Sequence, residues 1–307
     1  MTLNQTIRRG ALISVAGVCV AALAACGEDT ATGEAAALDT IDPGVIRVAV
    51  QPYAPYTSVK ADKLTGLDSD ILTKAAENLG LEVQPQVTDF NGMLGGVQSR
   101  RVDVAIGGIA WSEERQKEGL FTDPAYYSPP AMAVHGSATY ETIADLEGLD
   151  LGTVTGYVWV DSIKAIPGAE LHTYPDANGV INDLAAGRIQ VGFLDPLIII
   201  DAKEKRPDLD FTAQYLTPPT PEQIEASPDL GYLAPYQVAF YVAPEEPKLE
   251  AALSEEIAGM YANGELADLI KKYGGDPEQF LVPTPEMSTS RQGIDRPSDW
   301  AAPALTP

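Results

Sequence analysis

The stretch SRRVDVAIGG (residues 99–108) runs from the end of a predicted helix through a basic turn into a short apolar strand and a glycine pair. The stretch AGRIQVGFLD (residues 186–195) follows the same plan and ends on Leu194-Asp195 instead. In open α/β sheets, ligands bind at the carboxyl ends of strands. The two stretches therefore predict two lobes that each present one loop to a shared cleft, although any two units of this kind look alike.

The rest of the body alternates between strand-like and helix-like segments. Strands are predicted at 45–50, 81–87, 102–106, 150–154, 169–174, 190–194, 209–214 and 237–242, and helices at 68–79, 91–98, 157–165, 177–186, 196–205, 248–262 and 265–273. Such alternation predicts an α/β protein with parallel sheets.

Composition excludes several classes of protein. The 307 residues include 44 Asp and Glu but only 20 Lys and Arg, for a formal net charge of −24. Nucleic acids and anionic lipid surfaces are bound through clustered basic residues, so neither is expected as a partner. The two cysteines, Cys19 and Cys26, lie close together near the start. A disulfide scaffold and a cysteine zinc site are therefore not expected.

The first 25 residues have the form of a signal peptide, with Arg8 and Arg9 before an apolar run that is short for a membrane span. The run closes on LAACG (residues 23–27), which resembles the lipobox of bacterial lipoproteins. This predicts cleavage before Cys26 and lipidation of Cys26; the alternative is an ordinary signal peptide with a chance cysteine. Residues 26–44 are expected to form a flexible tether, and residues 284–307 a disordered tail.

Five segments in a fixed order resemble family 3 of the solute-binding proteins of bacterial ABC importers, the polar amino-acid type. The resemblance runs from about residue 45 to 280. The segments are 45–55, GLDSDIL (66–72), DFNG through RVD (89–103), SEER with FTDPAYY (112–127), and ANGEL through KKYG (262–274). Each segment is unspecific alone, and together they carry the resemblance.

The resemblance implies a two-lobed type II periplasmic-binding-protein fold, with two open, mostly parallel sheets joined by two hinge strands. Lobe 1 would comprise 45–128 plus 236–283, and lobe 2 would comprise 129–235. A small amino acid or related solute would bind between the lobes, and an ABC permease would recognise the closed form. The protein would be an extracytoplasmic monomer, anchored to the membrane by lipid on Cys26, with no cofactor or metal and no catalysis.

Arg115 is the first candidate ligand contact. In the family that the chain resembles, the arginine of this turn binds the ligand carboxylate. A guanidinium presents a planar pair of donors that matches a carboxylate. The preceding loop, which includes Gly108 and Ala110, is expected to offer backbone N–H groups to the same anion. The alternative is that Arg115 forms a surface ion pair with one of its neighbours, Glu113, Glu114 or Glu118.

Asp195, on the other lobe, is the second candidate. The resemblance implies that its carboxylate accepts hydrogen bonds from the ligand ammonium. The alternative is a helix cap, since Asp195-Pro196 suits the N-cap and N1 positions. The two roles are compatible if the backbone caps while the carboxylate faces the cleft.

Aromatic residues form the third set of candidates. Tyr53 and Phe90 lie where the family packs the ligand side chain, with core packing as the alternative. Trp111 and Trp159 lie on cleft loops and suit either the ligand or the core. Tyr157 begins a helix whose N-terminus points to the carboxylate in the family.

Departures from the family pattern bear on specificity. Ala110 replaces a frequent hydroxyl, and Tyr157-Val158 replaces a turn rich in Ser and Thr. Val50-Gln51 stands where members that bind Lys or Arg often carry an acid. The sequence therefore favours a neutral amino acid, or a related zwitterion or carboxylate.

Two other functions remain open from the sequence. Cyclohexadienyl dehydratases resemble this family and need a cleft acid, for which Asp89 and Asp195 are the candidates. A sensor that reports a ligand to a partner by contact is the second alternative. Asp68, another acid in a family segment, is expected to cap its helix.

Overall fold

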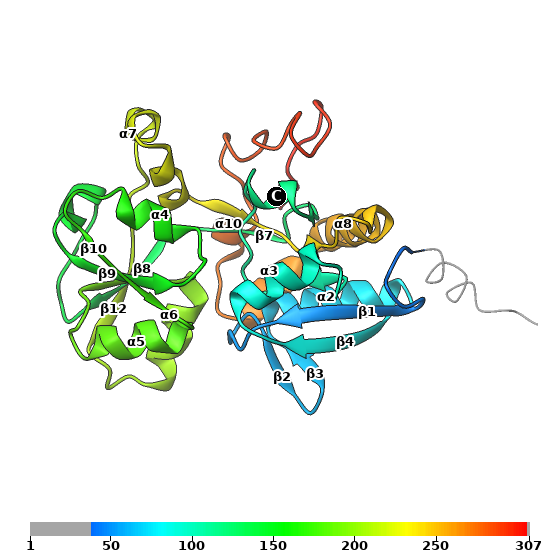
Figure 1. Ribbon diagram of the computed structural model, residues 1–307, viewed down its shortest axis with the longest axis horizontal. Coiled ribbons are helices and arrows are strands. Elements are labelled where there is room, and N and C mark those ends of the chain that lie inside the picture. Colours follow the sequence, from blue (N-terminus) through cyan, green and yellow to red (C-terminus); the bar gives the residue numbers. More distant parts are fainter. Residues whose placement is uncertain (1–37, 306–307) are drawn as a thin grey trace, which may run out of the picture.

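The computed structural model describes residues 38–305, so the predicted signal peptide and Cys26 lie outside the described residues. Two lobes lie side by side and are joined by a narrow pair of strands (Figure 1). Within residues 38–305, no helix combines the length and apolar character needed to cross a bilayer.

Lobe 1 is built on a five-stranded sheet of order β4-β1-β5-β14-β6. Its strands are β1 (Val45–Val50), β4 (Glu82–Val87), β5 (Val104–Ala105), β6 (Leu120–Phe121) and β14 (Tyr241–Val242). The covering helices are α2 (Leu67–Asn78), α3 (Phe90–Gln98), α8 (Pro247–Asn263), α9 (Glu265–Lys272) and α10 (Pro277–Phe280). A hairpin of β2 (Ser58–Lys60) and β3 (Lys63–Thr65) and the short 3-10 helix η1 (Arg115–Lys117) complete the lobe.

Lobe 2 has a second five-stranded sheet, of order β10-β9-β11-β8-β12. Its strands are β8 (Ala131–His135), β9 (Asp150–Val154), β10 (Glu170–Tyr174), β11 (Val191–Phe193) and β12 (Phe211–Tyr215). Its helices are α4 (Trp159–Lys164), α5 (Ala177–Ala185), α6 (Pro196–Lys205) and α7 (Pro221–Ala226), with 3-10 turns η2 (Ile143–Leu146) and η3 (Pro228–Leu233).

The connection between the lobes consists of β7 (Tyr126–Ser128) and β13 (Tyr236–Val238), which pair antiparallel. The chain crosses to lobe 2 through β7 and continues into β8, and it returns through β13 and continues into β14. Strand β14 is antiparallel to both of its neighbours, and so is β8. The expectation of open, mostly parallel sheets is confirmed in strand direction: four of the five strands in each sheet run the same way, and only the strand that enters from the hinge runs against them.

The predicted disordered tail is wrong for residues 284–305, here named the C-terminal segment, which fold against lobe 1. Arg291 is fully buried; its guanidinium donates to the carbonyls of Thr122 (2.8 Å) and Phe121 (3.2 Å). It also lies 5.6 Å from the ring centroids of both Trp111 and Trp300. The Pro-, Ser- and Thr-rich composition predicts disorder because it offers few apolar side chains, whereas one arginine and two indoles provide the anchor.

The predicted flexible tether is likewise wrong at its end, for residues 38–44. The Asp39 carboxylate accepts hydrogen bonds from the backbone N–H groups of Lys248 (3.2 Å) and Leu249 (3.0 Å). These groups open helix α8, where the first N–H groups have no partner within the helix. The segment therefore caps a helix about 200 residues away in the sequence.

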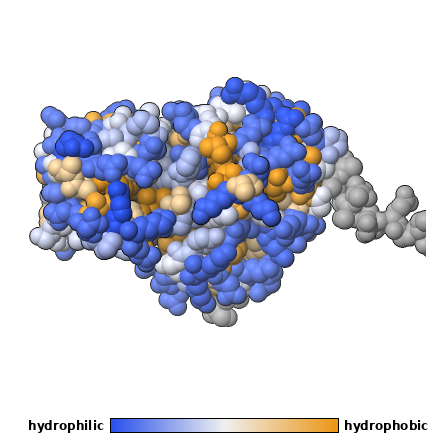
Figure 2. All heavy atoms as spheres, turned by 90° about the horizontal axis from the view of Figure 1, so that it is seen from below, coloured by the Kyte–Doolittle hydropathy of each residue, from blue (hydrophilic) through white to orange (hydrophobic). Residues whose placement is uncertain are grey.

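The surface is mostly hydrophilic on the face seen in Figure 2, with smaller apolar patches. Among the described residues, the large apolar side chains that are most exposed are few: Val87, Tyr215, Val282 and Ile294. The hydrophobic core instead extends through both lobes.

Candidate ligand site

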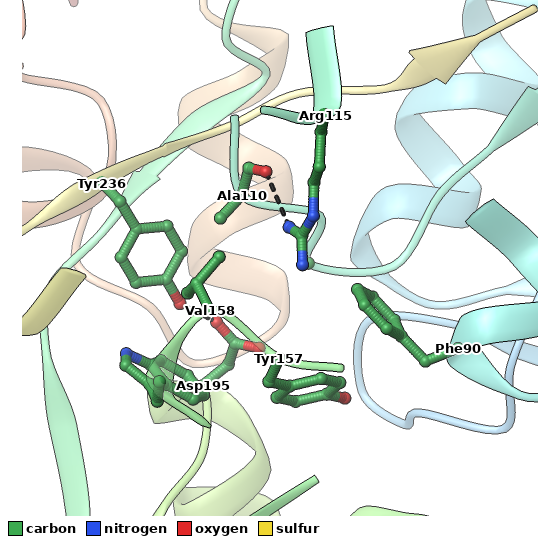
Figure 3. A pocket seen from close by; sticks show the side chains of 9 residues that line it. Phe90, Ala110, Arg115, Tyr157, Val158, Asp195 and Tyr236 are labelled. Carbon is green, nitrogen blue, oxygen red and sulfur yellow. Dashed lines mark hydrogen bonds between the residues drawn. The ribbon is translucent and has the colours of Figure 1, made fainter. Parts of the chain in front are cut away.

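A small cavity lies where the two lobes and the hinge meet (Figure 3). Its volume is about 10 Å³, which is room for about one water molecule. It is lined by Phe90, Gly108, Ala110, Arg115, Tyr157, Val158, Trp159, Asp195 and Tyr236. Seven of these nine residues are candidates from the sequence, with core packing as the stated alternative for Trp159.

Arg115 reaches the cavity from lobe 1. It begins η1, and its guanidinium donates to the carbonyl of Ala110 (2.9 Å) and, across the cleft, to the carbonyl of Gly156 (3.0 Å). The guanidinium carbon lies 5.3 Å from the ring centroid of Phe90. Within residues 38–305 it forms no ion pair, so the expected alternative of a surface pair with a neighbouring glutamate is not observed. Burial lowers the pKa of Arg115, yet a guanidinium stays charged.

Asp195 reaches the cavity from lobe 2 and is 2% exposed. It follows β11 and is the N-cap residue of α6, but its carboxylate makes no capping hydrogen bond. Instead the carboxylate accepts hydrogen bonds from the hydroxyls of Tyr53 (2.6 Å), Tyr236 and Ser128 (3.4 Å). Burial raises the pKa of Asp195 to about 6, although these hydrogen bonds act to lower it. Backbone capping and a carboxylate in the cleft therefore coexist, as the sequence allows.

Direct hydrogen bonds connect the lobes around this cavity. Besides the bonds of Tyr53 and Arg115, the amide of Gln51 donates to the hydroxyl of Tyr157 (2.9 Å). The N–H of Leu197, in α6, donates to the hydroxyl of Tyr56 (3.3 Å). A cavity of this size cannot hold an amino acid, so binding one requires the lobes to separate and these bonds to exchange.

Gly108 and Ala110 serve the site through their backbone. A Cβ atom at Gly108 would lie 2.9 Å from the Asp195 carboxylate, and its φ of +69° also favours glycine. Ala110 contributes the carbonyl that holds Arg115. Glycine at 108 therefore lets the two lobes approach closely at the carboxylate.

The expectation that this loop offers N–H groups to an anion in the cleft is wrong for its two glycines. The N–H groups of Gly107 and Gly108 both donate to Asp68 (2.9 Å each). Asp68 also accepts from the hydroxyl of Tyr126 (2.8 Å) and makes no helix cap, since α2 begins after Gly66. Burial raises the pKa of Asp68 to about 6. Asp68 therefore fixes the loop to the first hinge strand.

Three predicted site residues, Asp89, Trp111 and Tyr53, do not line the cavity. Asp89 is exposed and caps α3, accepting a hydrogen bond from the N–H of Gly92 (2.7 Å). The Trp111 indole donates to Asp295 (3.1 Å) and so faces the C-terminal segment. Asp89 fits the N-cap position, where aspartate satisfies a free N–H group. Tyr53 touches the cavity wall through Asp195.

Residues 46–276 of this chain match the sequence pattern shared by the bacterial extracellular solute-binding proteins, family 3. The chain belongs to this family. The match covers both sheets and the hinge, and it ends before the C-terminal segment.

Named relatives in the family bind amino acids. The L-cystine-binding protein TcyJ of Escherichia coli is 31% identical over 170 residues, which are 54% of this chain and 64% of that protein. The histidine-binding periplasmic protein of Salmonella typhimurium is 24% identical over 237 residues, 75% of this chain and 88% of that protein. The chain thus spans just under two thirds of the first of these relatives.

Solved structures share the fold. An ancestral amino-acid-binding protein, described as a precursor of cyclohexadienyl dehydratase, superposes with a TM-score of 0.62 at 18% identity. The match covers 75% of this chain and 95% of that one. At this identity the likeness supports the two-lobed fold and no more.

Two residues that line the cavity of this solute-binding protein, Tyr236 and Val158, were not predicted from the sequence. For Trp159, the sequence left open whether it contacts the ligand or packs in the core. Tyr236 is the first residue of β13, and Ser128, its partner in register, is the last of β7. Both donate to Asp195 from the hinge. The signal that points to them is position, because a residue at the start of a returning hinge strand lies beside the cleft.

One group of side chains has the spacing of metal ligands among the described residues: Asp150, Glu170 and His172. They lie on β9 and β10 of lobe 2 and do not line the cavity. The His172 ring already pairs with Asp150 at 2.8 Å. The group therefore has no part in the candidate site.

Proposed function

We propose that this protein captures a small amino acid, or a related zwitterion or carboxylate, between its lobes outside the cytoplasm and delivers it to an ABC permease. One observation carries the proposal: Arg115 of lobe 1 and Asp195 of lobe 2 line the same cavity, and each is held only by neutral partners among the described residues. The division into lobes at 45–128 plus 236–283 and at 129–235 is part of this proposal.

Arg115 would bind the solute carboxylate. Its present acceptors, the carbonyls of Ala110 and Gly156, are neutral. Hydrogen bonds between two charged groups are about twice as strong as those between neutral groups. A carboxylate between the lobes would therefore replace the Gly156 carbonyl at a gain, and the same contact would favour the closed arrangement.

Asp195 would face the cationic end of the solute. It is the only acid that lines the described cavity. A basic side chain would find no second acid there, because Gln51, which precedes the cleft, uses its amide on Tyr157. The cavity therefore favours a solute with one positive and one negative charge.

A screen of protein melting temperature against amino acids and small carboxylates tests the proposal. A ligand that binds only the folded protein raises its melting temperature. Calorimetry should then give a micromolar Kd, or about −8 kcal/mol. Conversion of a bound cyclohexadienyl acid, followed by NMR, would instead support the dehydratase alternative, and no binding by any compound would contradict capture.

The lipid anchor on Cys26 is a separate part of the proposal and rests on the sequence. Replacing Cys26→Ser should release the protein into the medium or leave it unprocessed, without changing solute affinity. Fractionation of cells that express each form measures this. Unchanged recovery in the membrane fraction would contradict lipidation.

A further inference from the structure

We propose that the solute is a betaine-type zwitterion, a carboxylate whose cationic nitrogen is methylated and carries few or no N–H groups. The inference rests on the proposed function and specifies its ligand class. It follows from which hydrogen-bonding groups and ring surfaces of the cavity wall remain free to contact a ligand.

The cavity wall contains three aromatic rings besides that of Phe90. Those of Tyr157 and Tyr236 are labelled in Figure 3, and the third belongs to Trp159. The Trp159 ring lies 5.8 Å from that of Tyr157 and 5.9 Å from that of Tyr236, centroid to centroid. The planes meet at 59° and 75°, so the rings form inclined walls and not a flat stack. Phe90, the fourth ring, already lies under the Arg115 guanidinium.

The polar ends of these rings are already occupied by protein. The indole N–H of Trp159 donates to the carbonyl of Tyr232 (3.1 Å). The hydroxyl of Tyr236 donates to Asp195, and the hydroxyl of Tyr157 accepts from Gln51. What these three side chains present to a ligand is therefore mainly ring carbon.

Asp195 supplies negative charge but little hydrogen-bonding capacity. A carboxylate has about four acceptor positions. Three are taken, by Tyr53 from lobe 1 and by Tyr236 and Ser128 from the hinge strands. One position is already free, and a solute that displaced Tyr53 would gain a second, whereas a primary ammonium brings three N–H donors. At least one donor would lose water without gaining an equal partner on Asp195, which is costly.

A methylated ammonium avoids this cost. It has no N–H group to satisfy, it is attracted by the charge of Asp195, and aromatic faces bind such cations electrostatically. The same ring surfaces also exclude water from the methyl groups. The wall thus suits a methylated cation better than a primary amine.

Two methylation series test the inference, because the carboxylate is constant within each. The first is glycine, sarcosine, N,N-dimethylglycine and glycine betaine; the second is proline and its N,N-dimethyl betaine. Calorimetry should show a falling Kd with each methyl group, at least about tenfold from the first to the last member. A constant or rising Kd in both series, or no binding by any member, would overturn the inference. If ordinary amino acids still bind, the proposed function stands.

Single substitutions test which residues cause the preference for methylated over primary amines. Trp159→Leu keeps apolar volume but removes a ring face, so it should reduce the preference for glycine betaine over glycine severalfold. Tyr236→Phe keeps the ring but frees an acceptor position on Asp195, so it should improve glycine binding and narrow the same ratio. Tyr215→Leu, which removes a half-exposed ring of β12 outside the cavity, is the matched control. A ratio unchanged in Tyr236→Phe and in folded Trp159→Leu would contradict the role of this wall.

Discussion

The two charged residues of the cavity have opposite kinds of hydrogen-bond partner. Arg115, on lobe 1, is surrounded by acceptors, and Asp195, on lobe 2, is surrounded by hydroxyl donors. Neither charge meets an opposite charge among the described residues. Burial acts against both, but a guanidinium keeps its proton, while the pKa of Asp195 rises to about 6. The cationic wall is therefore permanent, and the anionic wall depends on pH.

The largest expected effect comes from removing the permanent charge. Arg115→Ala should weaken binding of any carboxylate solute by at least about 100-fold, the loss typical of breaking a buried charged contact. Calorimetry measures the affinity, and thermal unfolding checks that the fold persists. An affinity within a factor of three of wild type would remove Arg115 from the site.

A smaller and more selective effect is expected on the other wall. Asp195→Asn should weaken a zwitterion by about tenfold, since it removes one charge at close range. The same change should leave a plain carboxylate of similar size unaffected or bound more tightly. Parallel titrations with the two solutes measure this, and equal losses for both would contradict a cationic contact at Asp195.

The pH dependence should follow mainly Asp195, because Asp68, whose pKa is also about 6, does not line the cavity. Its pKa of about 6 implies that it is charged at pH 7 and mostly protonated at pH 5. Zwitterion affinity should therefore fall by up to about tenfold between pH 7 and pH 5. Asp195→Asn should give a flat profile over this range. A wild-type profile that is equally flat would show that the carboxylate does not titrate in the site.

The smallest expected effect is on stability, and it has the opposite sign. Because the folded pKa of Asp195 (about 6) exceeds the ordinary value of about 3.9, the folded state holds the proton more tightly. Its contribution to the free energy of unfolding is full below about pH 4 and is lost as the pH rises through 6. Asp195→Asn should thus raise Tm at pH 8 by roughly 2–4 °C, the shift that about 1 kcal/mol produces at this size. Calorimetric scans at pH 8 and pH 4.5 test this, and a variant less stable at pH 8 would contradict it.

The fold was predictable where the pattern is local. The predicted helix at 68–79 ends before Gly80, and the observed α2 spans Leu67–Asn78. The C-terminal segment was not predictable, because its stability depends on contacts such as that of Arg291 with the carbonyl of Thr122, 169 residues away. Composition reports the local absence of apolar residues and cannot report such a distant partner.

The residues of the candidate site likewise fall into those that local sequence predicted and those that it did not. Arg115 and Asp195 lie in recognisable segments, and the structure brings both to one cavity. Asp89 was misplaced, because a capping aspartate at the start of a cleft helix has the same local pattern as a ligand contact. Tyr236 was missed, since its role arises only when the second hinge strand pairs with the first. Residue type and motif order were thus sufficient for the two charged residues and for Tyr157, but not for Tyr236.

The C-terminal segment places the end of the described chain beside the two hinge strands. The Tyr127 hydroxyl, on β7, donates to the carbonyl of Pro303, and the Gln237 amide, on β13, donates to that of Met287 (2.8 Å). Any rotation of the hinge must therefore strain or shift this segment. A fluorophore attached at Pro303 would sit next to the pivot, so this protein is a natural starting point for a biosensor whose emission reports solute capture without labelling the cleft.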